Sequence, residues 1–227
     1  MTDVTRDDPH GGQPIRTAGA PLAEAEVAMI MVHGRGASAE SILTLAPALA
    51  APGTAFLAPQ AGGSQGNQWY PYGFMAPIER NEPGISSGMR AIGRVLAQIE
   101  AAGIPPTRTH FLGFSQGACL ASEFVARHAR RYGGLAVLSG ALIGPDGTPR
   151  NYPGSLEGTP VFLGCSDVDA HIPAARVRES AEVLQRLGGE VTLRLYPGMG
   201  HMVNDDEIEA VRAMIAHSGR DPLSRAL

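Results

Sequence analysis

This 227-residue chain carries a serine and a histidine in short glycine-rich segments, and two aspartates between them. Together these side chains can build a nucleophile. Ser115 stands at the centre of the G-x-S-x-G run Gly113–Gly117, after a short apolar run and before helix-forming residues. On a strand-turn-helix of this kind the serine hydroxyl projects at the positive end of a helix. The motif predicts a nucleophile. The alternative is a flexible turn without chemistry, because a chain with 29 glycines can contain a G-x-S-x-G run by chance.

Partners for such a serine follow later in the chain, in the order serine, acid, histidine. Asp167 and Asp169 come after one apolar run, and His201 comes after another, in a glycine-rich turn. A serine hydroxyl needs a base to take its proton, an imidazole can serve near neutral pH, and a carboxylate fixes the imidazole tautomer. We predict Ser115 as nucleophile and His201 as general base. The spacing leaves open whether Asp167 or Asp169 is the acid.

Attack on a carbonyl also requires donors for the oxyanion that forms. The backbone N–H of Gln116 follows the nucleophile, and the backbone N–H of Arg35 lies in the glycine-flanked loop after an early apolar run. We predict these two groups as the oxyanion hole. His33, in the same loop, is expected to shape the loop rather than to transfer protons.

A metal site is another interpretation of some of these polar residues. Alternation of Asp167, Asp169 and His171 resembles part of a metal site, but no further cluster completes a ligand shell, so we expect neither a metal nor a cofactor. The remaining histidines have no supporting context and are assigned no role: His10, His110, His128 and His217.

Residues 60–83 form a long predicted loop that carries the only tryptophan. Loops of this length in compact domains usually serve a function. We expect Trp69 and Tyr70, with Tyr72 and Phe74, to line the substrate site, the alternative being that these aromatic rings belong to the core.

Strands and helices that could position these residues alternate along the chain. Strands are predicted at 27–32, 54–58, 109–112, 135–139, 160–164 and 190–196, and helices at 38–50 with a kink at Pro47, 85–103, 118–127, 177–187 and 208–215. Such alternation implies an α/β fold with a mostly parallel twisted sheet and helices on both faces. The strand at 190–196 alternates in polarity and is expected nearer the sheet edge. Chemistry in such sheets lies at the carboxyl ends of the strands, where the predicted serine, acid and histidine all stand.

Composition and charge narrow the class of protein. Hydrophobic residues make up 44% and charged residues 18%, with a net charge of −4. These values predict a globular protein without a nucleic-acid or membrane partner, and the polar N-terminus does not read as a signal peptide. Cys119 and Cys165 fall in predicted core elements, which favours packed free thiols in a cytoplasmic protein.

The length suits one domain. We expect residues 1–20 to be a loose N-terminal arm or an edge element and residues 21–227 to be a single domain. The sequence leaves the oligomeric state open, a homodimer included.

Four segments together resemble the phospholipase/carboxylesterase family of α/β-hydrolases, over about residues 27–217: His33–Ala37, Gly113–Gly117, Asp169–Pro173 and Gly200–His201. This resemblance implies an α/β-hydrolase fold without a large cap domain and a cofactor-free serine hydrolase acting on small-molecule esters of short to medium acyl chains. Its D-x-x-[V/I]-P pattern places the triad acid on Asp169. Thioesterases and lysophospholipases with the same triad, and a non-catalytic binding protein on this fold, are the alternatives.

Two departures from the family pattern bear on the substrate. The thioesterase branch usually carries an apolar residue where Arg35 stands, and an arginine there indicates either an anionic or polar substrate or only a surface salt bridge. The segments Trp69–Pro71 and Asn81–Pro83 resemble a bacterial esterase branch more than the lipid-protein thioesterases.

Overall fold

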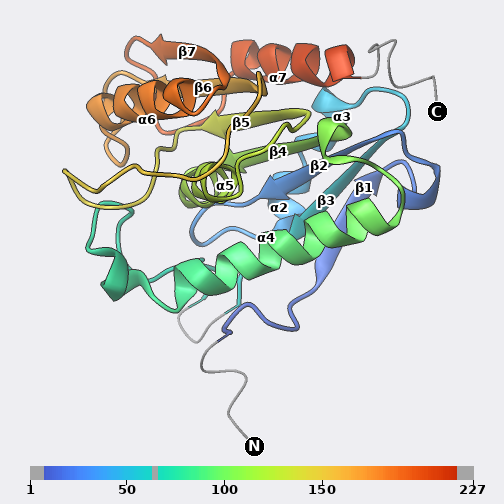
Figure 1. Cartoon of the computed structure of the whole chain (residues 1–227), viewed down its shortest axis with the longest axis horizontal. Coiled ribbons are helices and arrows are strands. Elements are labelled where there is room, and N and C mark those ends of the chain that lie inside the picture. The colour runs from blue at the N-terminus through green and yellow to red at the C-terminus, as the bar shows by residue number, and fades with distance from the viewer. Residues whose placement is uncertain (1–7, 63–65, 219–227) are drawn as a thin grey trace, which may run out of the picture.

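A seven-stranded sheet forms the middle of the molecule in the computed structural model, which describes residues 8–62 and 66–218 (Figure 1). The strands are β1 (Ile15–Gly19), β2 (Val27–Val32), β3 (Thr54–Pro59), β4 (Thr109–Phe114), β5 (Gly134–Leu138), β6 (Pro160–Ser166) and β7 (Glu190–Tyr196). The helices are α2 (Ala39–Leu43), α3 (Ala46–Leu49), α4 (Gly84–Ala101), α5 (Gln116–Arg127), α6 (Ala174–Arg186) and α7 (Asp205–Ser218), with short 3-10 turns η1 (Leu22–Glu24), η2 (Ile78–Asn81) and η3 (Pro106–Arg108).

The strand order is β1-β3-β2-β4-β5-β6-β7, and every pair is parallel except β1 with β3. The predicted mostly parallel α/β sheet is therefore confirmed. β7 lies at one edge of the sheet, as predicted. Its residues alternate in polarity because only one of its faces is covered.

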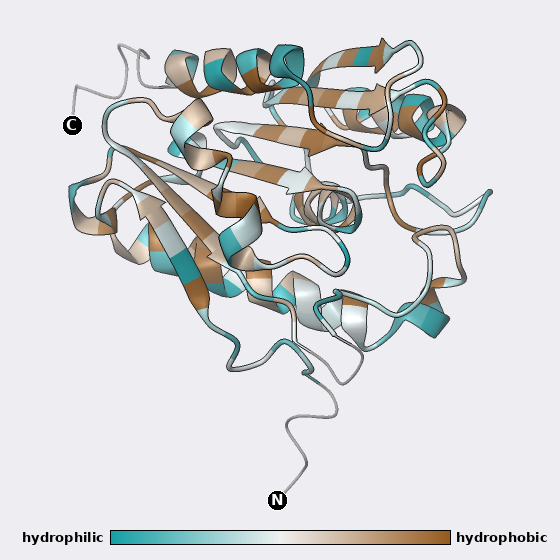
Figure 2. Cartoon of the chain, turned by 180° about the vertical axis from the view of Figure 1, so that it is seen from behind, coloured by the Kyte–Doolittle hydropathy of each residue, from teal (hydrophilic) through white to brown (hydrophobic). Residues whose placement is uncertain are grey.

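Helices cover both faces of the sheet and bury two apolar layers. On one face, alternate residues of β2 such as Ile30 pack with α4, α5 and α6, and α4 is the long green helix in front in Figure 1. On the other face, Met29 and Met31 pack with α2, α3 and α7. Because both faces are covered, all six residues of β2 are buried, as a continuous apolar run requires. Figure 2 shows hydrophobic and neutral residues along the central strands and hydrophilic bands on the helices.

The N-terminal segment differs from a loose arm where it is described. Ile15–Gly19 forms β1, which pairs antiparallel with β3, so the alternative of an edge element describes these residues. The domain boundary expected at residue 20 therefore leaves out a strand of the sheet. A short, half-polar strand is typical of a sheet edge, where one side has no neighbour to bury it. Residues 1–7 lie outside the described residues.

The predicted helix at 38–50 is two helices rather than one kinked helix. Ser38 caps α2, as predicted, and α2 ends at Leu43 before α3 begins close to Pro47. Proline lacks the N–H that a continuous helix would need, so it occurs in the first turn of a new one.

Both cysteines are buried free thiols. None of the described helices is long and apolar enough to cross a membrane.

Candidate active site

Ser115 lies on a sharp turn between β4 and α5 with a backbone φ of 56° and ψ of −122°. Residues other than glycine rarely adopt this conformation, and where it occurs the surrounding structure must hold it. The flanking glycines make that turn sterically accessible. A Cβ at Gly117 would stand 2.1 Å from the Val32 carbonyl oxygen, and one at Gly113 would stand 2.4 Å from the Gly117 carbonyl oxygen.

Three side chains from three strand ends meet at this turn. The Ser115 Oγ lies 2.8 Å from His201 Nε2, and His201 Nδ1 lies 2.7 Å from Asp169 Oδ2. With Nδ1–H donating to the carboxylate, Nε2 is free to accept the serine proton. The structure thus joins Ser115, His201 and Asp169 in one hydrogen-bonded chain, the arrangement that activates a serine nucleophile.

The Asp169 carboxylate is fully buried, and three further groups contact it besides His201. Its Oδ1 accepts the N–H groups of His171 and Ile172 at 2.8 and 3.0 Å, and Cys165 Sγ stands 3.8 Å from Oδ2. Burial raises the pKa of this carboxyl, but the hydrogen bonds from His201 and the two backbone N–H groups together hold the pKa below its ordinary value. Asp169 is therefore ionised at neutral pH.

Asp167 has a different partner. Its Oδ1 accepts the Gly198 N–H at 2.8 Å, which ties the end of β6 to the turn that precedes His201. The alternation that suggested a metal site instead separates these residues: Asp169 contacts His201, Asp167 supports a turn, and the exposed His171 ring lies edge-on to the His201 ring at 4.9 Å. Among the described residues, no group of three His, Cys, Asp or Glu side chains is placed to bind a metal.

The two residues whose backbone N–H groups are predicted as an oxyanion hole, Arg35 and Gln116, both border the cleft that holds Ser115. Gln116 begins α5, so its N–H has no carbonyl partner within the helix. Arg35 follows β2, and Gly34 of the same loop approaches Ser115 so closely that a Cβ there would lie 3.4 Å from the Ser115 Cβ. In the part of the chain that the structure describes, no protein acceptor takes the Arg35 backbone N–H.

His33 supports this loop from within the core. The ring is fully buried, Nε2 accepts the Ala61 N–H at 3.1 Å, and Nδ1 donates to the Gly34 carbonyl at 2.8 Å. Burial lowers the pKa of His33, in keeping with a neutral ring. These contacts agree with a loop-shaping residue and leave no proton for transfer.

Trp69 does not line the substrate site. It is fully buried behind the His33–Gly36 loop, and its Nε1–H donates to the His33 carbonyl at 2.8 Å. The His33 and His10 rings lie 5.0 and 5.1 Å from its ring. The expectation that Trp69 contacts substrate is wrong because a large ring with a single donor gains more from burial beside a carbonyl than from exposure in the polar loop. Tyr70, which is also buried, does border the cleft.

The Gln116 side chain, which the sequence analysis did not single out, holds the aromatic loop against α5. Its Oε1 accepts the Trp69 N–H and its Nε2 donates to the Tyr70 carbonyl, both at 2.8 Å. A primary amide is suited to this place because it presents one acceptor and one donor together. Gln116 thus has two separate parts in the site, a backbone N–H near Ser115 and an amide that anchors the loop.

Arg35 holds the other side of that loop. Its guanidinium donates to the Gln68 side-chain oxygen and to the carbonyls of Tyr70, Pro71 and Tyr72. The surface salt bridge considered for Arg35 is therefore not formed with any described carboxylate. The sequence could not indicate these partners, which lie more than 30 positions along the chain.

A cleft of about 380 Å³ opens over Ser115. This volume is at the lower end of the range for small-molecule sites. Its lining is Gly34, Arg35, Ala37, Tyr70, Gly73, Phe74, Phe114, Ser115, Gln116, Cys119, His171, Ile172 and His201. Apolar side chains dominate this set, and none of its members is an aspartate or a glutamate.

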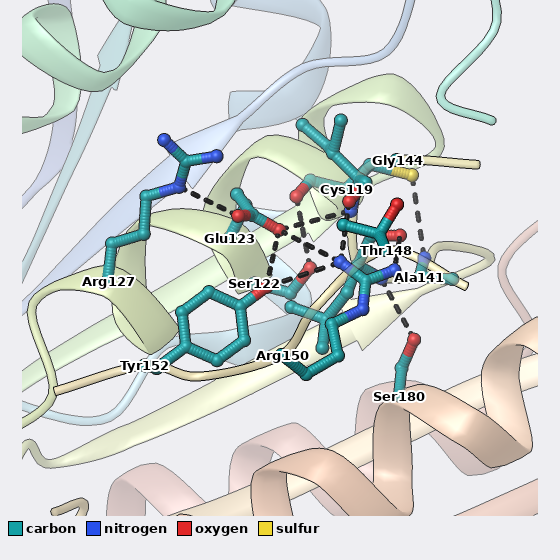
Figure 3. A network of polar contacts seen from close by, with 12 residues as sticks. Cys119, Ser122, Glu123, Arg127, Ala141, Gly144, Thr148, Arg150, Tyr152 and Ser180 are labelled. Carbon is teal, nitrogen blue, oxygen red and sulfur yellow. Dashed lines mark hydrogen bonds and ion pairs between the residues drawn. The ribbon is translucent and has the colours of Figure 1, made fainter. Parts of the chain in front are cut away.

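One wall of the cleft is anchored by a buried polar network, shown in Figure 3. Glu123 of α5 accepts the Ile143 N–H at 3.1 Å and the Tyr152 O–H at 3.0 Å, and Arg127 donates to its other oxygen. These bonds fix the segment after β5, whose Ala141 and Gly144 donate backbone N–H groups to Cys119 and Phe74 of the lining. The network therefore sets where the cleft wall stands.

Comparison with known proteins agrees with this arrangement. The family model described as phospholipase/carboxylesterase matches residues 17–218. A phospholipase/carboxylesterase of known structure from Dyadobacter fermentans superposes with a TM-score of 0.85 at 40% identity, covering 90% of this chain and 97% of that one.

Two curated relatives match over shorter segments. A probable carboxylesterase from Oryza sativa subsp. japonica is 31% identical over 144 residues, which is 61% of this chain and 54% of the relative. Acyl-protein thioesterase 1 from Gibberella zeae is 30% identical over 147 residues, or 60% of each chain. The matched part thus spans between half and two thirds of these two relatives.

Proposed function

The chain belongs to the phospholipase/carboxylesterase family, whose members are carboxylic ester hydrolases, and from that membership we propose a serine carboxylesterase acting on short to medium acyl esters. The observation that carries the proposal is the chain of hydrogen bonds from Ser115 through His201 to Asp169 at the floor of a cleft. Its geometry and its chemistry are those of acyl transfer to serine.

In the first half of the proposed reaction, Ser115 Oγ attacks the acyl carbonyl carbon while its proton passes to His201 Nε2. Asp169 stabilises the imidazolium that forms, through the 2.7 Å bond to Nδ1. The backbone N–H groups of Arg35 and Gln116 bind the oxyanion of the tetrahedral intermediate. His201 then returns the proton to the leaving alcohol, which departs and leaves an acyl-serine ester.

The second half repeats this chemistry with water. His201 takes a proton from water as the hydroxyl oxygen attacks the acyl carbon, and then returns it to Ser115 Oγ as the carboxylic acid leaves. The cleft of about 380 Å³ supports acyl groups of short to medium length. An unactivated serine hydroxyl would react far more slowly, because its proton would have no acceptor.

The deciding experiment is hydrolysis of p-nitrophenyl butyrate by the wild-type protein beside Ser115→Ala. We expect kcat to fall at least about 10³-fold in Ser115→Ala. Ser155→Ala, an exposed serine in the connection before β6, is the matched control and should keep wild-type activity. Equal rates in wild type and a folded Ser115→Ala protein, with no labelling of Ser115 by a fluorophosphonate, would instead favour the non-catalytic binding protein.

A thioesterase is the second candidate, favoured by the similarity to an acyl-protein thioesterase. It would use the same three side chains, because the tetrahedral step is common to esters and thioesters. Butyryl esters and butyryl thioesters with leaving groups of matched acidity distinguish the two: a higher kcat/KM for the thioester would replace the carboxylesterase proposal.

A further inference from the structure

Arg35 brings a positive charge to the cleft without a carboxylate to neutralise it. Its four hydrogen-bond partners are an amide oxygen and three backbone carbonyls, all of them neutral. The side chain is exposed and borders the same cleft as Ser115. A guanidinium bound only by carbonyl oxygens retains its full charge.

This lack of a counter-charge separates Arg35 from most arginines of the described residues. Nine of them form ion pairs with aspartate or glutamate: Arg16, Arg90, Arg94, Arg127, Arg130, Arg150, Arg176, Arg194 and Arg212. The cleft lining itself contains no acidic side chain. The nearest functional carboxylate, Asp169, is fully buried behind the His201 ring and does not border the cleft.

The position of Arg35 in the loop also fixes where its charge stands. The residue supplies the backbone N–H proposed for the oxyanion hole, and its guanidinium is held in place by the loop that carries Tyr70 and Tyr72. A charge held by four hydrogen bonds acts at a defined place and loses little side-chain entropy on binding. It is therefore a preorganised cation on a residue that borders the cleft.

From these contacts we propose that the cleft selects esters carrying a carboxylate group, attracted by Arg35, over uncharged esters of the same shape. The inference rests on the proposed ester hydrolysis and names its substrate class. The anionic group can belong to the acyl half or to the alcohol half of the ester, and the two are separated by the choice of substrate. At the edge of a cleft, where water screens the pair, we expect a preference of about three- to tenfold.

The test compares isosteric substrates. On the acyl side, mono-p-nitrophenyl adipate is compared with the p-nitrophenyl ester of adipic acid monoamide, and on the alcohol side 4-acetoxybenzoate is compared with 4-acetoxybenzamide. The measured quantity is the ratio of kcat/KM for the carboxylate to kcat/KM for the amide, after subtraction of spontaneous hydrolysis. We expect a ratio above one for one pair in the wild type, falling toward one in 1 M NaCl because salt screens the charge.

Three variants separate charge from loop support. Arg35→Gln should lower that ratio by about three- to tenfold, whereas Arg35→Lys, which keeps the charge but cannot reproduce the four hydrogen bonds, should retain most of it. Arg131→Gln is the matched control: Arg131 is exposed, donates to the Glu157 carbonyl and precedes β5 at the opposite end of the sheet, so the ratio should not change.

Each other outcome overturns the inference. If Arg35→Gln slows both members of each pair equally, Arg35 only supports the loop. If Arg131→Gln lowers the ratio as much, the effect belongs to overall charge. If Arg35→Gln fails to fold, the wild type alone still tests the inference. A carboxylate-to-amide ratio that does not change in 1 M NaCl would show that the charge of Arg35 does not select the substrate. Failure of the proposed function looks different, because then the amide substrates too would show no hydrolysis dependent on Ser115.

Discussion

Individual side chains in this site are distinguished by their partners rather than by their types. Asp167 and Asp169 are both aspartates after β6, yet one holds a backbone N–H of the 197–200 turn and the other holds the His201 ring. Their spacing of two residues could not separate them, because the direction of each side chain depends on the turn that follows β6. In the folded turn, His171 and Ile172 donate to Asp169, and it is this carboxylate that contacts His201.

This difference gives a prediction for the two carboxylates. Asp169→Asn should lower kcat about 10⁴-fold, because an amide cannot stabilise the imidazolium and favours the wrong tautomer of His201. Asp167→Asn should lower kcat less than about threefold, because the asparagine oxygen can still accept the Gly198 N–H. Steady-state hydrolysis of p-nitrophenyl butyrate measures both, with circular dichroism as the check on folding. Comparable losses of kcat in the two variants would mean that Asp169 is not the specific partner of His201.

Residue types and motif spacing carried the prediction of Ser115, His201 and the oxyanion loop, because strand-turn-helix chemistry is local in sequence. Contacts between distant segments were not accessible in the same way. The amide of Gln116 and the guanidinium of Arg35 both bind the loop around Tyr70, and nothing near either residue in the sequence indicates it. Trp69 shows the same limit: a polar local sequence suggested a cleft residue, but tertiary burial against His33 decided its place.

At the scale of elements, the five inner strands β2–β6 were predictable because each is a largely apolar run that helices cover on both faces. Their ends were less so. The strand expected to end at Ser139 ends at Leu138, because Ser139 turns to a φ of 49° and directs its N–H to the Gly164 carbonyl. The helix predicted across Pro47 is divided for a reason that is local, since proline interrupts the hydrogen-bond ladder.

Helix α4 offers a prediction from two of its own glycines. A Cβ at Gly93 would meet only Phe124, at 3.9 Å, whereas a Cβ at Gly88 would stand 2.7 Å from Leu120 Cδ2 and 3.4 Å from Trp69 Cε3. Gly93→Ala should therefore stabilise the fold by about 0.5–1 kcal/mol through helix propensity. Gly88→Ala gains the same propensity but should destabilise by about 1–2 kcal/mol, because the packed side chains must move.

Urea denaturation followed by far-UV circular dichroism measures this pair of variants. The expected result is a midpoint above that of the wild type for Gly93→Ala and below it for Gly88→Ala. Equal stabilisation of both would mean that the Leu120 side chain moves aside without cost.

At the scale of the whole molecule, a few acidic and basic side chains are buried in the core. Glu207 is an example outside the reacting groups. It is fully buried in the first turn of α7, close to Asn204, which lies three residues after His201. The Asn204 N–H donates to Glu207 Oε2, and the Glu207 N–H donates to Asn204 Oδ1. Glu207 Oε1 has no partner among the described residues and lies 2.2 Å from the position that a Cβ on Gly164 would take. The absence of a side chain at Gly164 makes room for this carboxyl group in the core.

Burial raises the pKa of Glu207 from 4.5 to about 7, against the smaller opposite effect of its hydrogen bond with Asn204. Between these two pH values the folded protein keeps a proton that the unfolded chain has released. The contribution of this group to the free energy of unfolding is therefore fully present below about pH 4.5, and it is lost as pH rises through about 7. The corresponding free energy is about 3 kcal/mol, which is a large part of the stability of a typical domain.

Glu207→Gln tests this account, because glutamine keeps the acceptor for the Asn204 N–H but cannot ionise. Urea denaturation of wild type and variant at pH 5 and pH 8 gives two differences in the free energy of unfolding. We expect the variant to gain about 2–3 kcal/mol relative to wild type between the two pH values. Other titrating groups act on both proteins alike and cancel. Glu209→Gln, an exposed residue of the same helix, should follow the wild type, and if Glu207→Gln follows it too, the carboxyl of Glu207 does not titrate in this range.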